Sequence, residues 1–365
     1  MSILDQVNEH TLPQKYQNMN DTELANLVTL RKHQLGDRIY IPGHHYQKDE
    51  VIQFANDTGD SLQLARKAAQ NTQAEFIVFC GVHFMAETAD ILTADHQTVI
   101  LPDLRAGCSM ADMANIHQLN QAWTVFSDVF GDAITPLTYI NSTAAIKSFC
   151  GQRGGATLTS SNAKAMLQWA LDQNEKVLFL PDQHLGRNTA VELGIQLDEM
   201  VVWDPIQHCF EGEVDAERTK VILWKGHCSV HEKFTTAQIH AMKQQDPHIQ
   251  VIVHPECPYE VVRQADISGS TKTIIETIDQ APAGSSWAIG TEMNLVNRLM
   301  KRHPDKTIRS LNPYMCPCLT MNRIDLQHFA WALDSIAGGE PVNVIQVDQE
   351  TAIYAKQALD RMLKR

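Results

Sequence analysis

The chain has 365 residues, of which 44% are hydrophobic and 20% charged, as expected for a globular protein of two or three domains. Its net charge of −13 argues against nucleic acid or an anionic membrane as a partner. Met1–Asn20 contains no apolar signal segment and no run of about 18 apolar residues is present, so we expect a cytoplasmic protein. In that reducing compartment, eight cysteines indicate a metal, cluster or catalytic role more than disulfides.

In chain order, four kinds of segment recur three times. They are a strand with polar residues at its end, a hydroxyl-bearing turn that opens a helix, an apolar strand with a loop, and a strand that runs into a cysteine. The segments are 39–56, 59–69, 75–87 and 98–108, then 134–150, 159–170, 176–186 and 220–228, then 251–266, 268–278, 285–295 and 307–318.

The spacing between segments is similar in the three repeats. His44 lies 17 residues before Ser61, and His254 lies 16 residues before Ser270. The middle repeat is longer by roughly 20 residues before its cysteine, so we expect an insertion near residues 187–216.

Alternation of strands and helices at this spacing predicts an α/β fold with parallel sheets covered by helices. Ligands bind beyond the carboxyl ends of such strands, so three similar units would aim their polar strand ends and cysteines at one point. The expected domains are 111–230, 231–319, and 1–110 with a returning segment 320–365. That last segment has no fourth copy of the repeat, and we expect it to pack on the first domain.

Three cysteines each follow an apolar strand, beside Gly, Pro or Ser: Cys108, Cys228 and Cys318. Three thiolates from three loops suit a [4Fe-4S] cluster with one iron left open to substrate. Zinc with three thiolates and a water is the main alternative, although the paired CxxC signature is missing from the sequence. In the CPC sequence at 316–318, Cys316 also suits the ligand position, but Cys318 fits the repeat spacing better.

The other cysteines give weaker signals. Cys80, Cys150 and Cys209 lie in apolar or ambiguous contexts, where we expect core thiols. Cys257 directly follows the sequence His254-Pro255-Glu256, which suggests that it lies close to the proposed cysteine ligands.

Polar residues at the strand ends are candidates for chemistry. His44, His45 and Tyr46 follow the first strand, where a histidine either binds an anion and shuttles protons or simply lies at the surface. His254 and Glu256 are two residues apart at a later strand end, as expected for acid–base work or for a loop ion pair.

The hydroxyl-bearing turns have two interpretations. Asp60-Ser61, Thr159-Ser160 and Ser270-Thr271 each precede a helical pattern, so each is either a helix N-cap or part of an anion site at a helix N-terminus. His231 is a further candidate, because it places an imidazole three residues after Cys228.

Together these residues resemble the quinolinate synthase family across nearly the whole chain. The resemblance is carried by GHHYQKDEV, TGDSLQLAR, LPDLRAGCSMADM, TYINSTA, KGHCSVHEKF, VHPEC and CLTMNRIDL. It implies three related α/β domains in a pseudo-threefold arrangement. It also implies a [4Fe-4S] cluster held by Cys108, Cys228 and Cys318, with one open iron.

The same resemblance implies the reaction. Iminoaspartate and dihydroxyacetone phosphate condense to quinolinate, with loss of phosphate and water, and L-aspartate oxidase is a candidate supplier of iminoaspartate. The implied catalytic residues are Tyr46, Glu256, His231 and His44. The implied substrate-binding residues are His44, Ser61, Tyr139, Asn141, Ser160, His254, Glu256, Ser270 and Thr271. Another cluster-dependent hydro-lyase and a non-enzymatic iron–sulfur sensor are the alternatives.

Overall fold

The structure, a computed structural model, describes residues 11–364, which divide into two units. The first unit comprises residues 11–108 and 317–348, and the second comprises residues 109–316 and 349–364. Residues 1–10, half of the segment in which we looked for a signal, lie outside the described residues. Within residues 11–364, every helix is too short or too polar to cross a membrane.

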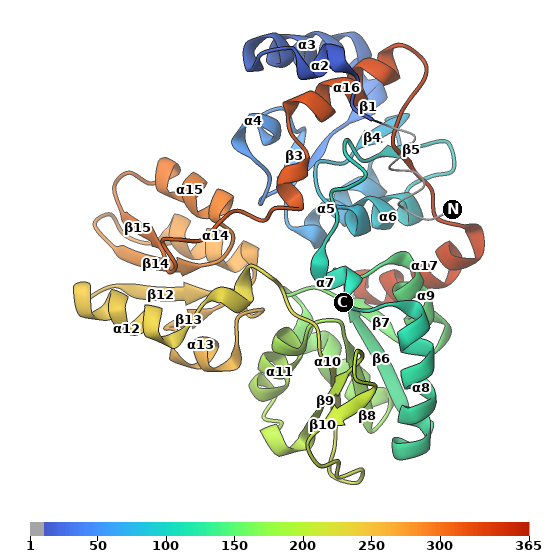
Figure 1. The fold of residues 1–365 in the computed structure, drawn as a ribbon, viewed down its shortest axis with the longest axis vertical. Helices are drawn as coiled ribbons and strands as arrows, with labels where there is room; N and C mark the ends of the chain where they lie inside the picture. Colours follow the sequence, from blue (N-terminus) through green and yellow to red (C-terminus); the bar gives the residue numbers. More distant parts are fainter. Residues whose placement is uncertain (1–10, 365) are drawn as a thin grey trace. The chain divides into compact units, whose positions relative to one another are not determined.

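The first unit contains a four-stranded, mostly parallel sheet and a two-stranded parallel sheet (Figure 1). Its strands are β1 (Ile39–Tyr40), β2 (Pro42–His44), β3 (Asp57–Gly59), β4 (Phe76–Val78), β5 (Thr98–Ile100) and β16 (Val344–Ile345). Its helices are α2 (Gln14–Gln17), α3 (Asp21–Leu35), α4 (Asp49–Ile52), α5 (Ser61–Gln70), α6 (His83–Leu92) and α16 (Leu326–Ala337), with 3₁₀ turns η1 (Gly36–Arg38) and η4 (Met321–Arg323).

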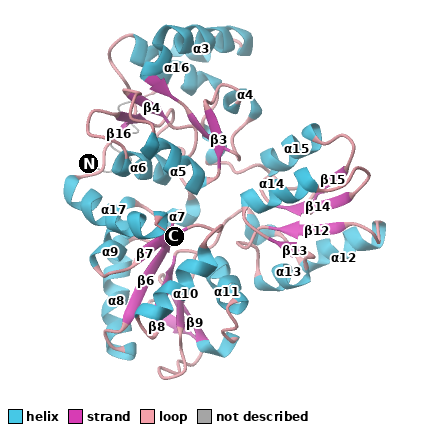
Figure 2. Ribbon diagram, turned by 180° about the vertical axis from the view of Figure 1, so that it is seen from behind, coloured by secondary structure: helices cyan, strands magenta, loops and turns pink. Residues whose placement is uncertain are grey.

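All strand pairs of the first unit are parallel except the one that involves the edge strand β16. β1 pairs with β4, β4 with β5 and β2 with β3, and β16 adds an antiparallel edge to β5. Ile77, Val78, Val99 and Ile100 are fully buried, as expected for parallel strands covered on both faces. Figure 2 shows α16 beside α3.

The second unit contains a six-stranded and a four-stranded sheet (Figure 1). The strands of the larger sheet are β6 (Ile134–Tyr139), β7 (Ala156–Leu158), β8 (Lys176–Leu180), β9 (Met200–Asp204), β10 (Cys209–Glu211) and β11 (Val221–Trp224). The helices that precede, connect or flank them are α7 (Ser109–Asp112), α8 (Ile116–Phe130), α9 (Ala144–Gln152), α10 (Ala163–Gln173), α11 (Gln183–Glu192) and the 3₁₀ turn η2 (Leu197–Glu199).

The smaller sheet follows in sequence. Its strands are β12 (Gln250–Val253), β13 (Ile267–Ser268), β14 (Ser286–Gly290) and β15 (Thr307–Ser310). Its helices are α12 (Thr236–Gln245), α13 (Tyr259–Gln264), α14 (Thr271–Gln280) and α15 (Met293–Arg302), preceded by the 3₁₀ turn η3 (His231–Lys233). All of its strand pairs are parallel.

The three sheets share one strand order. In the second unit the orders are β7-β6-β8-β11 and β13-β12-β14-β15; in the first unit β3 pairs with β2, β1 with β4, and β4 with β5. When β1 and β2, which only Ile41 separates, are counted as one strand, the second strand in sequence lies at one edge in each case, and the order is 2-1-3-4. The predicted α/β class with short parallel sheets is confirmed, and the common order supports the repeats found in the sequence.

Two helix caps repeat as well. The carboxylate of Asp182 accepts hydrogen bonds from the second and third residues of α11 at 2.7 and 3.2 Å. The carboxylate of Glu292 does the same for α15, at 2.7 and 3.3 Å. Both residues follow the third strand of their sheets and are fully buried. Such caps satisfy orphan N–H groups at helix starts.

The insertion in the middle repeat begins later than 187, because α11 has counterparts in α6 and α15. The extra elements are η2, β9 and β10. β9 continues the parallel sheet beside β11, and β10 turns back against β9. Trp203 of β9 and Phe210 of β10 contact the aromatic side chain of Phe126 on α8, which anchors the insertion to the core.

The C-terminal segment differs from the expected placement. Its first helix, α16, packs on α3 of the first unit, but its last helix, α17 (Gln349–Leu363), packs on α9 and β7 of the second unit (Figure 1). The apolar side chains of Leu359 and Met362 are fully buried there. The helical spacing predicted an apolar face but not which neighbour covers it.

Candidate active site

In the first unit, His44 and Tyr46 lie at the end of β2. His44 is 4% exposed, and its ring meets that of Tyr46 edge to face with 4.8 Å between centroids. The Tyr46 N–H donates to Nδ1 of His44 at 3.1 Å, so a neutral His44 carries its proton on Nε2. Gly59, the residue paired with His44 across β2 and β3, lies two residues before Ser61.

Ser61 is the first residue of α5. Asp60 caps this helix: its carboxylate accepts from the Gln63 N–H at 2.9 Å, and the Gln63 side chain accepts from the Asp60 N–H at 3.1 Å. Asp60 is therefore the cap that the sequence suggested, which leaves the Ser61 hydroxyl at a helix N-terminus that favours anions.

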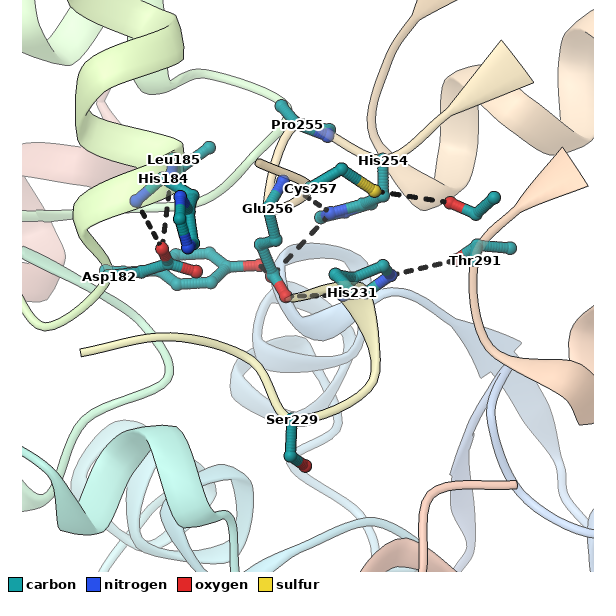
Figure 3. Close-up of polar contacts among 12 residues, drawn as sticks. Asp182, His184, Leu185, Ser229, His231, His254, Pro255, Glu256, Cys257 and Thr291 are labelled. Atoms are coloured by element: carbon teal, nitrogen blue, oxygen red, sulfur yellow. Dashed lines mark hydrogen bonds and ion pairs between the residues drawn. The ribbon is translucent and has the colours of Figure 1, made fainter. Parts of the chain in front are cut away.

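In the second unit, Glu256 is the centre of a buried hydrogen-bond network (Figure 3). The hydroxyl of Tyr139, at the end of β6, donates to Oε1 of Glu256 at 2.7 Å. Nδ1 of His231 donates to Oε2 of Glu256 at 2.7 Å, and Nε2 of His231 lies 3.2 Å from the Thr291 hydroxyl. Three chain segments far apart in sequence thus meet at one carboxylate, and a fourth reaches it through His231.

The electrostatics favour a charged Glu256 beside a neutral His254. Burial raises the pKa of Glu256, but the His254 and His231 imidazoles and the hydrogen bonds from His231 and Tyr139 outweigh it and hold this pKa below its usual range. Burial lowers the pKa of His254 to about 3 despite the attraction of Glu256. The His231 and His254 rings stack with 4.5 Å between centroids. This arrangement can hold and move a proton at the Glu256 carboxylate.

A cavity of about 500 Å³ adjoins this network within the second unit and is lined by Ser160, Pro255 and Ser270, among others. Ser270 caps α14, its hydroxyl accepting from the Thr273 N–H at 3.3 Å, and Thr271 is the first residue of that helix. Ser160 precedes α10, whose start has no side-chain cap. The starts of two helices therefore line this cavity, and the free N–H groups at helix N-termini favour anions.

Unpaired buried polar atoms gather at the carboxyl end of the larger sheet. Among the described residues, those without a hydrogen-bond partner there are Asn141 Oδ1, Asn162 Nδ2, Asp182 Oδ2, both ring nitrogens of His184, and Asn188 Oδ1. Buried polar groups are normally paired, so such a cluster marks a place where water or a ligand binds. Of these residues, only Asn141 was predicted as a site residue.

The sequence analysis missed Asp182, His184 and Asn188, which lie at and beyond the start of α11. The sequence does contain a signal for these three residues. The polar loop 181–186 of the third repeated segment follows an apolar strand, as do the loops that supplied the predicted site residues. Burial raises the pKa of Asp182, and nearby Glu256 raises it further. Burial lowers the pKa of His184 to about 4. Figure 3 shows both residues beside the Glu256 network.

The eight cysteines fall into three groups. Cys80, Cys150 and Cys257 are buried, and burial raises the pKa of each thiol. Cys209 and Cys316 are exposed, so the expectation of a core thiol is wrong for Cys209, which lies on the edge strand β10. The third group is half-buried and consists of Cys108, Cys228 and Cys318.

The half-buried cysteines have the chemistry that a cluster needs, because a thiolate ligand must be accessible and not held neutral in a core. Within the second unit, Ser229 lies 3.4 Å from Ser109, oxygen to oxygen, and these serines directly follow Cys228 and Cys108 in the chain. The ligand atoms of Cys228, His231 and Glu256 all lie within 4.8 Å of one another. The residues present therefore fit a metal group beside the Glu256 network.

The described structure divides the predicted residues between the units. The first unit holds His44, Tyr46, Ser61, Cys108 and Cys318. The second unit brings Tyr139, His231, His254 and Glu256 into direct contact and lines one cavity with Ser160 and Ser270. Asn141 lies beyond the carboxyl end of β6, and Thr271 lies beyond the carboxyl end of β13. Cys228 lies near His231.

Comparison with known proteins gives a consistent result. The sequence model described as quinolinate synthetase A protein matches residues 27–364. The chain is 64% identical to the quinolinate synthase of Geobacillus kaustophilus over 364 residues, which cover 100% of this chain and 99% of the relative. It is 61% identical to the quinolinate synthase of Bacillus subtilis over 365 residues, again covering 100% and 99%. The resemblance seen in the sequence is confirmed: the chain belongs to the quinolinate synthase family.

Proposed function

We propose that this protein condenses iminoaspartate with dihydroxyacetone phosphate to form quinolinate, releasing phosphate and two waters. The observation that carries the proposal is the Tyr139–Glu256–His231 network, a buried acid–base centre beside a cavity with two helix N-termini. Such a site suits a substrate pair that carries carboxylates and a phosphate and must exchange several protons.

The proposed cofactor is a [4Fe-4S] cluster held by Cys108, Cys228 and Cys318. The half-burial of these three thiols supports this choice, and the exposure of Cys316 favours Cys318 as the third ligand. When bound, a cluster with one open iron supplies a Lewis acid toward a hydroxyl or carboxylate oxygen, which is the chemistry that a dehydration needs. Everything else in the reaction falls to the chain's own residues.

Anion binding is the first of these tasks. We assign the substrate carboxylates to His44, Ser61, Tyr139, Asn141 and Ser160, through charge-assisted hydrogen bonds and helix N-termini. We assign the phosphate, and later a product carboxylate, to His254, Ser270 and Thr271. The depressed pKa of His254 supports its role as a neutral donor that does not need to lose a proton.

Proton transfer is the second task. Glu256 is charged in the resting network, so it can accept a proton from the substrate and return it during imine formation or ring closure. His231 orients the Glu256 carboxylate through Nδ1 and is itself held by Thr291. Tyr46, beside His44, is the proposed second proton-transfer residue.

The common strand order supports three α/β domains with the bounds expected from the sequence, 1–110 plus 320–365, 111–230 and 231–319, except that α17 joins the second of them. We propose that they adopt a pseudo-threefold arrangement, with one cysteine from each. Because iminoaspartate hydrolyses in water, an aspartate-oxidising enzyme such as L-aspartate oxidase is the proposed supplier.

The test is anaerobic purification followed by turnover. The protein should be brown, contain about four irons and four sulfides per chain, and form quinolinate from the two substrates, measured by chromatography. A colourless zinc protein without turnover would refute the proposal. A brown protein that dehydrates a hydroxy acid but makes no quinolinate would instead support the hydro-lyase alternative.

A further inference from the structure

Asn188 holds the backbone on both sides of Glu256. It lies on α11 and is 8% exposed. Its side-chain amide Nδ2 donates to the carbonyl of Pro255 at 2.8 Å and to the carbonyl of Cys257 at 2.9 Å. Figure 3 shows Pro255 and Cys257 flanking Glu256, with the start of α11 close by.

The two bonds fix the orientation of the amide. Both N–H groups of Nδ2 are used, so a flipped amide would set Oδ1 against two carbonyl oxygens. Among the described residues Oδ1 has no hydrogen-bond partner, and it belongs to a side chain that lines the cavity, where water or a ligand can bind it. The amide thus gives both of its donors to the turn around Glu256 and keeps its acceptor toward the cavity.

We propose that Asn188 is a positioning residue for Glu256: it ties both neighbouring peptide groups to α11 and so keeps the carboxylate within reach of Tyr139 and His231. Both hydrogen bonds of the Glu256 carboxylate are short, at 2.7 Å, so a displacement of the turn would lengthen them. The inference deepens the proposed function and rests on it for its activity readout.

The loop has few other constraints of this kind. The His254 N–H donates to Gly290 O at 3.0 Å, and the Cys257 N–H donates to His254 O at 3.0 Å, so the turn is anchored at its start and closed on itself. The two Asn188 bonds tie the backbone on the far side of the turn to α11, whereas Tyr139 of β6 contacts the turn through the Glu256 side chain. Without them the carboxylate can move by about an ångström, a displacement that costs on the order of 10²-fold in rate.

The test is a double-mutant cycle with Asn188→Ala and Glu256→Gln, plus the isosteric Asn188→Asp. Asn188→Ala and Asn188→Asp should lower kcat about 10²-fold with little change in KM. In the Glu256→Gln background the same substitutions should change kcat less than about twofold, because Asn188 acts through Glu256.

The matched control is Asn174→Ala. Asn174 also uses its amide Nδ2, donating to the Thr135 hydroxyl at 2.9 Å, but at the amino end of β6. Its loss should lower the melting temperature by about as much as Asn188→Ala, roughly 2–4 °C, and leave kcat unchanged. An equal loss of kcat from Asn188→Ala in both Glu256 backgrounds would overturn the positioning role.

Hydrogen–deuterium exchange separates this inference from the proposed function. The backbone amides of His254, Glu256 and Cys257 should exchange faster in Asn188→Ala and Asn188→Asp than in the wild type, and at the wild-type rate in Asn174→Ala. Unchanged exchange together with wild-type kcat refutes the inference. If the wild type makes no quinolinate, the proposed function fails, while the exchange result still decides whether Asn188 fixes the turn.

Discussion

His44 and His254 occupy the same turn in two different α/β repeats. The His44 N–H donates to the carbonyl of Cys80 at 3.0 Å, and the His254 N–H donates to the carbonyl of Gly290 at 3.0 Å. In each case Nδ1 accepts from the N–H two residues later, at 3.1 and 3.3 Å. Tyr46 and Glu256 are therefore equivalent positions, and both are proposed proton-transfer residues.

Replacing Glu256 with Gln should lower kcat about 10²–10⁴-fold, the range for loss of a general acid–base group. The amide keeps the side-chain shape but cannot take up a proton. Glu260→Gln, an exposed change on α13, is the control and should keep full activity. Full turnover by Glu256→Gln would rule out its proton-transfer role.

Stability should fall as pH drops from about 6.5 to about 4, in part because of His184. Burial, Arg187 and His227 lower its pKa from 6.5 to about 4, so in this window the unfolded chain binds a proton that the folded chain does not. The stabilisation is complete above pH 6.5 and is lost as pH falls through the window. Thermal melts of His184→Gln should show a shallower pH slope than the wild type, whereas exposed His117→Gln should keep the wild-type slope.

Removing Arg105 should destabilise the first unit by about 1–3 kcal/mol, the cost of a buried group left unpaired. Its guanidinium binds both carboxylate oxygens of Asp103, at 3.0 and 2.9 Å, and Asp103 is 4% exposed. Nε2 of His328 accepts from Arg105 at 3.2 Å, and Nδ1 of His328 donates to Asp325 at 2.8 Å.

Denaturant unfolding checks this prediction with two variants. Arg105→Met leaves the Asp103 carboxylate with the backbone N–H of residue 105 but without its charged partner, whereas Asp103→Asn with Arg105→Met removes the charge as well. The double variant should be more stable than Arg105→Met alone. The opposite order would show that the ion pair contributes nothing of its own.

Serine at Cys108, Cys228 or Cys318 should each abolish stable iron binding, because three thiolates are the proposed ligands. Iron per chain after anaerobic reconstitution and gel filtration is the measurement. Cys209→Ser and Cys316→Ser, both at exposed positions, should retain about four irons. If Cys318→Ser keeps its iron and Cys316→Ser loses it, the third ligand is Cys316 and not Cys318.

Alanine at Gly151 should destabilise the second unit by about 3 kcal/mol, the upper end for overpacking. An added Cβ would lie 1.9 Å from the carbonyl oxygen of Tyr354, so α17 must move off α9. Gly338→Ala is the control, since its nearest neighbours would lie at 3.4 and 3.6 Å. Equal urea midpoints for the two variants would contradict the close helix packing.

Much of the fold follows from the sequence because the repeats are local. Hydrophobic strands, turn residues and caps such as Asp60 and Ser270 act over a few residues, and three copies of the pattern reinforce one another. The strand order 2-1-3-4 then follows from short right-handed crossovers between parallel strands.

The rest depends on contacts between distant segments. Whether α17 covers α9 or the first sheet is decided by shape, such as the space at Gly151, and the helical pattern is the same in either case. Asn188 was missed for the same reason, because its value lies in two carbonyls nearly 70 residues away. Thr159-Ser160 was predicted as a possible cap, yet Asn162 holds the turn instead.

The placement of α17 also bears on how the protein is made. The chain leaves the first unit at Cys108, returns at Pro317 and leaves again after Asp348. On the ribosome, α9 and β7 emerge long before α17, the helix that covers them. Neither unit can close before its C-terminal part has been synthesised, so the nascent chain exposes the apolar surface beneath α17 while the whole of the smaller sheet and α16 are being made.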